Sequence, residues 1–375
     1  FWARIIDWRI VGECRAGAFS MYVQRQCEKR VQHLEFDVES WYHWLEPVTF
    51  RSKFVTLGLA EAQALVVLYQ HRYCHRRSPS ADELMLLTGL EQAIDTAMSE
   101  ACLELGCAPK FFVRLSSRSP KDAAPVRLSQ FQDALRQVEA DPEYSAGVGA
   151  SFDVNRKMVA LSDCMSDMAV TTGLGAMTLL TSSERTFGDL ITATATEELY
   201  AAHPMKVILR VWEERLDHRM EFRAFVCAGE LTAMSQYNHY CYFPEVVRRK
   251  GELLEVLRSF WDEEVRQRVP LPNYVVDFAV MEPAGSASQV AVVELNPFET
   301  TTGGALYDWS ADADLLRNGP LGLRVHEAPL DAIAQYVDYC IEEISSGEKA
   351  AADKLVDWRP KEADPPRAGR RCMIM

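Results

Sequence analysis

Five segments rich in β-branched, aromatic and other apolar residues predict five strands in the second half of the chain. The hairpin turn CAGEL joins the second segment to the third, and a longer EPAGSAS turn joins the fourth to the fifth. The five segments cover residues 205–212, 220–229, 230–237, 274–281 and 289–298.

Helical patterns fill much of the remaining chain. The longest covers residues 81–106, where apolar residues recur at three- and four-residue steps and Ser80 and Glu83 complete a capping box. Residues 35–57 end in alternating β-type residues and predict a strand, as does KFFVRL at 110–115. Together these elements indicate an α+β protein. The other helices are predicted over 59–70, twice within 127–170, and over 183–200, 244–267 and 328–345.

The length and composition allow a sizeable core. With 375 residues and 48% hydrophobic content, the chain forms one large domain or two closely packed lobes. Residues 1–34 show no clear periodicity and are an unassigned N-terminal extension, residues 35–345 form the main domain, and the polar residues 346–375 form a mobile tail. No apolar run approaches the length that crosses a bilayer.

Charge and cysteine content narrow the class of protein. The formal net charge of −14 disfavours a nucleic-acid partner, because phosphate contacts require clustered Lys and Arg. The ten cysteines are scattered and none forms a C-x-x-C pair. This is typical of reduced thiols in an intracellular protein rather than of a disulfide framework or a zinc site.

Two of the predicted strands carry polar residues in apolar surroundings. Asp277 lies in YVVDFAV, and Glu294 and Asn296 lie two residues apart in VVELNPF, on one face of the strand. A carboxylate in such a strand is costly unless something pairs with it. Three oxygen ligands from neighbouring strands suit Mg²⁺, which takes carboxylates together with phosphate oxygens and waters. The alternative is that these groups hydrogen-bond to backbone or to arginine at a sheet edge.

A magnesium site with phosphate calls for basic groups nearby. Arg114, Arg210 and Arg223 each lie in a predicted strand, where a lone charge is poorly placed and a phosphate gives it a bidentate partner. The alternative for each is an internal salt bridge, for example between Arg223 and Glu221. The loop SSRSPKD at 116–122 either folds over phosphates or is a solvated surface turn.

Several common signatures are missing from the sequence. There is no G-x-x-x-x-G-K-[ST] phosphate loop. GLGAMT at 173–178 lacks the third glycine and the preceding strand of a dinucleotide motif, and it is interpreted as a helix–turn element. The spacing of the eight histidines indicates no Ser/His/Asp arrangement.

These segments, taken in order, resemble the cell division cycle protein 123 family. The landmarks are SWYHWL, VTF, VRLSSRSPKDA, VILRVWEER, MEFRAFV, LTAMSQY, YVVDFAV and VVELNPFETTTGGALYDW. They cover most of residues 36–310, and EFRAFV and ELNPF at this separation are specific when taken together. The resemblance implies an ATP-grasp fold, with two lobes of mainly antiparallel sheet enclosing ATP and helices packed outside. It also implies an assembly chaperone for eukaryotic translation initiation factor 2 that binds the gamma subunit of this factor.

The resemblance implies ATP and Mg²⁺ as cofactors and gives roles to particular residues. Arg114, where the family usually has Lys, contacts phosphate, and Arg223 points toward the phosphates. Glu294 stands where the family usually has Asp. The stretch 124–182 is longer than its counterpart in the family. The implied magnesium ligands are Asp277, Glu294 and Asn296. The other implied nucleotide contacts are Ser116, Ser119 and Asp122 in the loop, and Arg210, Val211 and Trp212 at a hinge that edges the adenine.

Three hypotheses about function follow. The first is the ATP-dependent chaperone, and the second is an ATP-grasp ligase or phosphotransferase with an unknown acceptor, for which segment 235–243 lines a second-substrate pocket. The third is a membrane-recruited scaffold that binds nucleotide without turnover. The final letters RRCMIM fit a C-a-a-X box, which predicts a farnesyl group on Cys372. One lipid and a small basic patch predict weak membrane association of an otherwise cytoplasmic protein.

Overall fold

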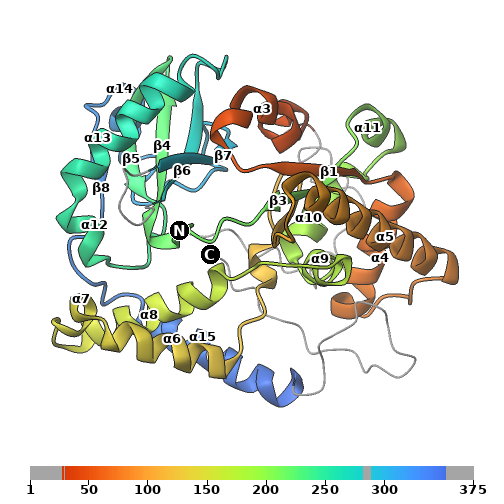
Figure 1. Cartoon of the computed structure of the whole chain (residues 1–375), viewed down its shortest axis with the longest axis horizontal. Coiled ribbons are helices and arrows are strands. Elements are labelled where there is room, and N and C mark those ends of the chain that lie inside the picture. The colour runs from red at the N-terminus through yellow and green to blue at the C-terminus, as the bar shows by residue number, and fades with distance from the viewer. Residues whose placement is uncertain (1–27, 29, 282–288, 352–375) are drawn as a thin grey trace.

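The computed structural model describes residue 28, residues 30–281 and residues 289–351, and it contains two β-sheets surrounded by helices (Figure 1). The strand order is β1-β3-β2 in the three-stranded sheet and β7-β6-β4-β5-β8 in the five-stranded sheet. Neighbouring strands are antiparallel, apart from β8, which pairs in parallel with β5. The expected α+β class, with two lobes of mainly antiparallel sheet and helices outside, is confirmed.

The three-stranded sheet buries one face and presents polar residues on the other. It consists of β1 (Ser52–Thr56), β3 (Lys206–Val211) and β2 (Phe111–Leu115). Val113 and Leu209 on the buried face join the same apolar core as the helices beside the sheet. Arg114 pairs with Ile208 in the register, and alternation along the strands therefore places Arg114 and Arg210 on the opposite face. The helices of this lobe are α4 (Leu59–Cys74), α5 (Ala81–Leu105), α9 (Gly173–Leu180), α10 (Glu184–Ala193) and α11 (Glu197–Ala202).

The five-stranded sheet likewise has an apolar face and a partly polar face. Phe222, Phe278 and Val292 share a core with Leu253 and Leu257 of the helix packed outside. The strands are β4 (Glu221–Cys227), β5 (Glu230–Gln236), β6 (Tyr274–Met281), β7 (Gln289–Asn296) and β8 (Leu323–Arg324). The outer helices are α12 (Pro244–Arg248), α13 (Lys250–Phe260) and the π-helix η5 (Trp261–Val265), and α14 (Ala313–Asn318) packs against β4 and β5.

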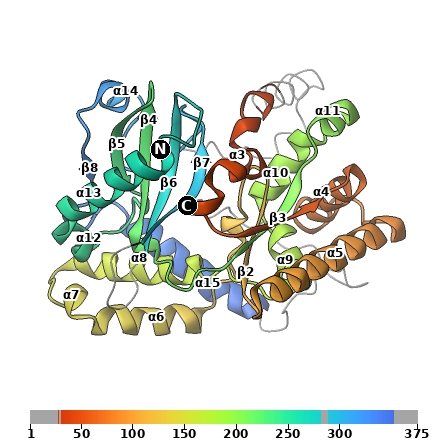
Figure 2. The same cartoon turned by 45° about the horizontal axis from the view of Figure 1, so that its top comes forward.

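A helical layer lies below the five-stranded sheet in the views of Figures 1 and 2. It is built from the helices between residues 128 and 166, together with the last helix of the described chain. Phe131, Val138 and Met158 of this layer belong to the core of the five-stranded sheet, so the layer is part of the same packed unit. Its helices are α6 (Leu128–Ala140), α7 (Pro142–Ser145), α8 (Ala150–Ser166) and α15 (Ala334–Ala351).

The strand predicted over residues 35–57 is wrong for most of its length. The segment instead contains the 3₁₀ turn η1 (Leu34–Phe36), α3 (Val38–Leu45) and the 3₁₀ turn η2 (Glu46–Val48) before β1 begins. Val38, Trp41 and Leu45 recur at helical spacing and are fully buried, so α3 buries one face against the sheets. Burial of this stripe outweighs the β propensity of the aromatic residues.

The other predicted elements differ mainly at their ends. The five strands of the second half are confirmed, and the capping box of α5 is present, with hydrogen bonds of 3.2 Å from Glu83 N to Ser80 Oγ and 2.8 Å from Ser80 N to Glu83 Oε2. The helix predicted over 183–200 is divided because Thr196 accepts a hydrogen bond from Leu199 N and starts a new helix, α11. The 244–267 helix is likewise divided into α12, α13 and η5.

Two short 3₁₀ turns complete the described elements, η3 (Lys121–Ala123) after β2 and η4 (His218–Met220) before β4. None of the described helices is both long and apolar enough to span a membrane. The predicted N-terminal extension up to residue 27, and the tail beyond residue 351 with Cys372, lie outside the described residues.

Candidate functional site

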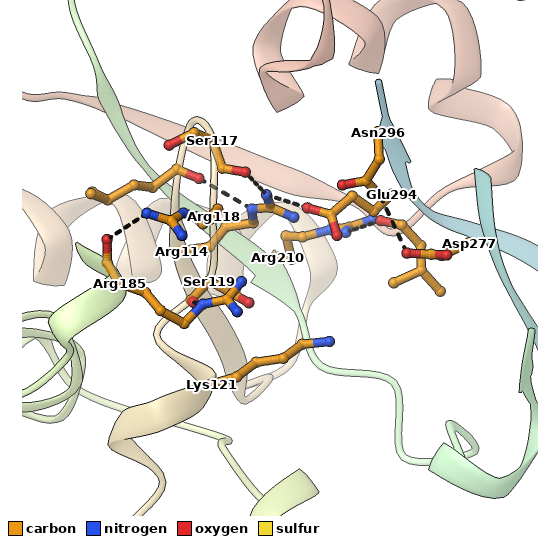
Figure 3. Close-up of polar contacts among 12 residues, drawn as sticks. Arg114, Ser117, Arg118, Ser119, Lys121, Arg185, Arg210, Asp277, Glu294 and Asn296 are labelled. Atoms are coloured by element: carbon orange, nitrogen blue, oxygen red, sulfur yellow. Dashed lines mark hydrogen bonds and ion pairs between the residues drawn. The ribbon is translucent and has the colours of Figure 1, made fainter. Parts of the chain in front are cut away.

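A row of polar side chains crosses the five-stranded sheet on the face opposite α13. Ser235 pairs with Arg223, Arg223 with Asp277, and Asp277 with Glu294, so these residues lie side by side on four adjacent strands. Asn296 follows two residues after Glu294 on β7 and faces the same way. The structure therefore brings together the three side chains that the sequence indicated as oxygen ligands (Figure 3).

Arg223 and Asp277 form a buried bidentate ion pair. Nε and Nη2 of Arg223 donate to the two carboxylate oxygens of Asp277 at 2.8 and 2.7 Å. The remaining nitrogen Nη1 donates to the carbonyl of Gly303 at 2.6 Å, and Asn296 Nδ2 donates to Asp277 at 3.3 Å. Burial disfavours the charged guanidinium, but the neighbouring Asp277 more than offsets this and raises the pKa of Arg223. The suggested pair of Arg223 with Glu221 is therefore replaced by the cross-strand pair.

A second ion pair connects the two sheets. Arg114 on β2 lies 2.6 Å from Glu294 on β7, and its Nη2 also donates to the carbonyl of Ser117 at 2.9 Å. Burial would raise the pKa of Glu294, but Arg114 and Lys121 more than offset it and lower this pKa to about 2. Glu294 is therefore a carboxylate at neutral pH, and the polar faces of the two sheets meet at this pair.

Arg210 strengthens the same junction. Its Nη2 donates to Thr49 Oγ1 at 2.8 Å, and its Nη1 donates to the carbonyl of Val293 on β7. Burial and the nearby Arg114 lower the pKa of Arg210 to about 9. Within the part of the chain that the structure describes, Arg210 Nε is buried and has no hydrogen-bond partner. An acceptor group at this point would satisfy the atom and stabilise the charge.

Lys121 and Tyr237 also lie at the site. The sequence placed Lys121 in the candidate phosphate loop and Tyr237 in segment 235–243, but it did not predict that the two side chains meet. Lys121 Nζ donates to the Tyr237 hydroxyl at 3.0 Å and lies 4.6 Å from the centre of the ring, and the Arg223 guanidinium lies 4.9 Å from the same ring. The order of strands explains this, because Tyr237 follows directly after β5, beside β4. Cations from both lobes thus converge on one aromatic ring.

Many polar groups of the loop of residues 116–122 form hydrogen bonds with other parts of the protein. Ser116 Oγ donates to Glu39 Oε1 at 2.6 Å and accepts from Lys206 N at 2.9 Å. Asp122 accepts a hydrogen bond of 2.6 Å from Ser183 Oγ and others from backbone N–H groups at the start of α10. The carbonyl of Ser119 accepts from Arg185 Nε at 3.0 Å. Ser116 and Asp122 therefore shape the loop, and their side chains already have partners within the protein.

The predicted hinge residues lie where the chain leaves the three-stranded sheet. Val211 N donates to the carbonyl of Arg51, and Trp212 N to that of Lys110, both at 2.8 Å. The chain then continues to β4 in the other sheet. Val211 and Trp212 therefore lie at the connection between the lobes, and their role as a hinge beside the adenine stays a prediction.

The matches to known proteins concern mainly the part of the chain that contains the five-stranded sheet. The family model D123 matches residues 164–338, which include Arg210, Arg223, Asp277, Glu294 and Asn296. Over these residues the chain is similar to the D123 family. Strand β2 and the loop 116–122 precede the matched D123 region.

The chain is also similar to several curated proteins over part of its length. It is 27% identical over 145 residues to the "translation initiation factor eIF2 assembly protein" of Vanderwaltozyma polyspora, covering 38% of this chain and 34% of that protein. It is 29% identical over 163 residues to "cell division cycle protein 123" of Aspergillus terreus, covering 43% of this chain and 35% of that protein. The chain therefore spans about a third of the length of these relatives. The structure of Cdc123 from Schizosaccharomyces pombe matches with a TM-score of 0.47 and 18% identity, over 77% of this chain and 95% of that one.

The side chains on β6 and β7 of the D123 region fit a magnesium ion by their chemistry. Among the described residues no group of three His, Cys, Asp and Glu side chains could hold a metal, so the fit depends on two carboxylates and one amide. Such oxygen donors are those that Mg²⁺ takes when phosphate oxygens and waters complete its shell. Each of the two carboxylates is paired with an arginine. A bound phosphate group would also attract these guanidinium groups.

The ion pair between Glu294 and Arg114 predicts a pH-dependent stability of the protein. The pKa of Glu294 is lowered from 4.5 to about 2, so the pair contributes fully above pH 4.5 and its contribution is lost as the pH falls toward 2. We expect Glu294→Gln to lower the free energy of unfolding by about 3 kcal/mol near pH 6 and by progressively less below pH 4.5. Urea denaturation between pH 3 and pH 7 measures this difference.

A matched control is Glu255→Gln, which removes a carboxylate that pairs with Arg258 on the exposed surface of α13. Its effect should stay below about 1 kcal/mol at each pH. A Glu294→Gln effect that is equally large at pH 3 and pH 7 would contradict the assigned ion pair.

Proposed function

We propose that this protein binds Mg-ATP between its two sheets, in the manner of an ATP-grasp protein, and assists the assembly of eukaryotic translation initiation factor 2. The observation that carries the nucleotide part is the meeting of Asp277, Glu294 and Asn296 with arginines from both sheets. Relatives named as eIF2 assembly proteins support the assembly part.

The proposed roles follow from the charges in the site. Asp277, Glu294 and Asn296 hold Mg²⁺, which when bound supplies positive charge to phosphate oxygens. Arg114 and Arg223 now neutralise the two carboxylates and are the cations closest to them. When phosphates attract these guanidinium groups, the carboxylates become available to the metal. Metal and nucleotide are therefore expected to bind together, each one weakly without the other.

The nucleotide would also hold the two lobes in one arrangement. Arg114 and Arg210 come from the three-stranded sheet, whereas Arg223 and the oxygen ligands come from the five-stranded sheet. A ligand that contacts both sets stabilises the arrangement in which they face each other. This gives an assembly chaperone a use for ATP without turnover, because the bound nucleotide fixes the surface that a partner recognises.

The proposed partner is the gamma subunit of the initiation factor, and the proposed location is the cytoplasm. An ATP-grasp ligase or phosphotransferase is the alternative, for which segment 235–243 was expected to line an acceptor pocket. In the structure the amide of Gln236 donates to the carbonyls of Asn238 and Cys241, and Asn238 Nδ2 donates to Ser162 Oγ. These amides maintain the fold of the segment, so the chaperone is the better-supported proposal.

Calorimetry combined with a partner-binding assay tests the proposal. We expect one molecule of ATP to bind per chain in the presence of Mg²⁺, and binding at least tenfold weaker when EDTA replaces the metal, because the carboxylates then repel the phosphates. Capture of the purified gamma subunit should increase with Mg-ATP and consume none of it. ATP hydrolysis that depends on a defined acceptor would favour the ligase instead, and an absence of heat with ATP would refute the nucleotide site.

Membrane association through Cys372 stays a prediction from the sequence. Cys372→Ser should abolish any membrane-bound fraction of the protein if the farnesyl group is present.

A further inference from the structure

The loop of residues 116–122 is fixed on α10 by the carboxylate of Asp189. This carboxylate accepts hydrogen bonds from Ser117 Oγ and from two nitrogens of Arg118, with the bond from Arg118 Nε measuring 2.8 Å. The side chain of Asp189 is 13% exposed. Burial would raise the pKa of Asp189, but Arg118 and Ser117 more than offset this and lower it, so the group is ionised at neutral pH. Hydrogen bonds to an ionised group of this kind are short and strong.

The far end of the same loop is also attached to α10, but here the loop supplies the carboxylate and α10 supplies the hydrogen-bond donors. Asp122 accepts hydrogen bonds from Ser183 Oγ and Glu184 N at 2.6 and 2.7 Å, at the start of α10. Arg185 Nε, one turn before Asp189, donates to the carbonyl of Ser119 at 3.0 Å. The loop therefore has partners on α10 near both of its ends.

Ser117 joins this anchor to the ion pair that connects the sheets. Its hydroxyl donates to Asp189, while its carbonyl accepts a hydrogen bond of 2.9 Å from Arg114 Nη2. The same nitrogen of Arg114 lies 2.6 Å from Glu294 Oε1. Figure 3 shows Arg114 between Ser117 and Glu294. A continuous series of contacts thus runs from Asp189 through Ser117 and Arg114 to Glu294.

We infer that Asp189 is a positioning residue, which sets the conformation of loop 116–122 and through Ser117 the orientation of Arg114 in the site. The inference rests on the proposed Mg-ATP site. Asp189 itself lies on α10 and contacts the loop, and its effect reaches Glu294 only through Ser117 and Arg114. The guanidinium of Arg114 must be aimed correctly, because its contact with phosphate is directional.

The test combines nucleotide affinity with the local dynamics of the loop. We expect Asp189→Asn to raise the Kd for Mg-ATP on the order of tenfold, the effect of losing a charge-assisted contact. Hydrogen exchange of the backbone amides of residues 116–122 should become faster in the same variant without nucleotide, while exchange in the five-stranded sheet stays unchanged. Asp133→Asn, which removes a carboxylate paired with Arg136 on the exposed surface of α6, should change neither quantity.

A double-mutant cycle separates positioning from a general loss of stability. If Asp189 acts through Ser117, then Ser117→Ala combined with Asp189→Asn should weaken Mg-ATP binding no further than Asp189→Asn alone. Independent effects would multiply and would overturn the inference, as would an unchanged Kd in Asp189→Asn. If Asp189→Asn does not fold, Ser117→Ala alone must show the faster exchange and weaker binding, and the inference fails if it shows neither.

The experiment also separates this inference from the proposed function. If the wild-type protein gives no heat with Mg-ATP, the nucleotide site is refuted while the exchange measurement still decides whether Asp189 fixes the loop. If the wild type binds and Asp189→Asn binds equally well, the site stands and the positioning role is refuted.

Discussion

Replacing Asp277 by Asn is expected to weaken Mg-ATP binding on the order of 100-fold, about 2.7 kcal/mol, while the protein still folds. Asp277 is 1% exposed and both of its oxygens accept hydrogen bonds from Arg223. Asn keeps the size of the side chain and one acceptor oxygen, so the packing survives. The negative charge that attracts a divalent cation is lost, and a neutral amide is a much weaker ligand for Mg²⁺.

Titration calorimetry at saturating Mg²⁺ measures this loss, and circular dichroism verifies that the variant is folded. Asp133→Asn is the matched control, since its ion pair with Arg136 on α6 is exposed and lies outside the proposed site. We expect Glu294→Gln to weaken binding to a comparable extent because it removes the other carboxylate. Wild-type affinity in both variants would refute the assignment of these residues as metal ligands.

Arg223→Met is expected to lower the free energy of unfolding of the ligand-free protein by about 3–5 kcal/mol. The substitution leaves the carboxylate of Asp277 buried, and among the described residues its remaining side-chain hydrogen bond comes from Asn296. An unpaired charge in such surroundings is costly, whereas an apolar pair of similar volume packs well. The double variant Arg223→Met with Asp277→Leu should therefore recover most of the lost stability.

Urea denaturation of the two single variants and the double variant gives the coupling energy of the pair. Arg258→Met is the control, because its ion pair with Glu255 is exposed and should contribute less than about 1 kcal/mol. A loss in Arg223→Met no larger than that of the control would mean that the pair is not buried as described. The double variant must also lose Mg-ATP binding, which separates its regained stability from function.

The alternation of residues in the strands predicted much of the proposed site. Glu294 and Asn296 had to share one face because they lie two residues apart in a strand, and an apolar frame around Asp277 required a partner. The partner itself was not predictable, because Glu221 on the same strand and Asp277 on the neighbouring strand were both available to Arg223. The antiparallel register of β4 and β6 makes Asp277 the partner, because it places Asp277 directly opposite Arg223.

Loop 116–122 shows where local sequence was insufficient. Its hydroxyls and cations fitted a phosphate-binding loop and a solvated turn equally well. In the structure Ser116 and Asp122 bond to Glu39 and to the start of α10, which come from distant parts of the chain. No local pattern carries that information, because the pairing depends on how α3 and α10 pack beside β2.

The sequence by itself determined the α+β class, the positions of most strands and the set of acids and arginines that a nucleotide site requires. These follow from periodicity and from the cost of burying charge, which act over a few neighbouring residues. Only the tertiary structure decided that α3 replaces a strand, that Arg114 of one sheet meets Glu294 of the other, and that Lys121 reaches Tyr237. Such contacts depend on register and packing between segments that lie far apart in the chain, and a linear pattern does not specify them.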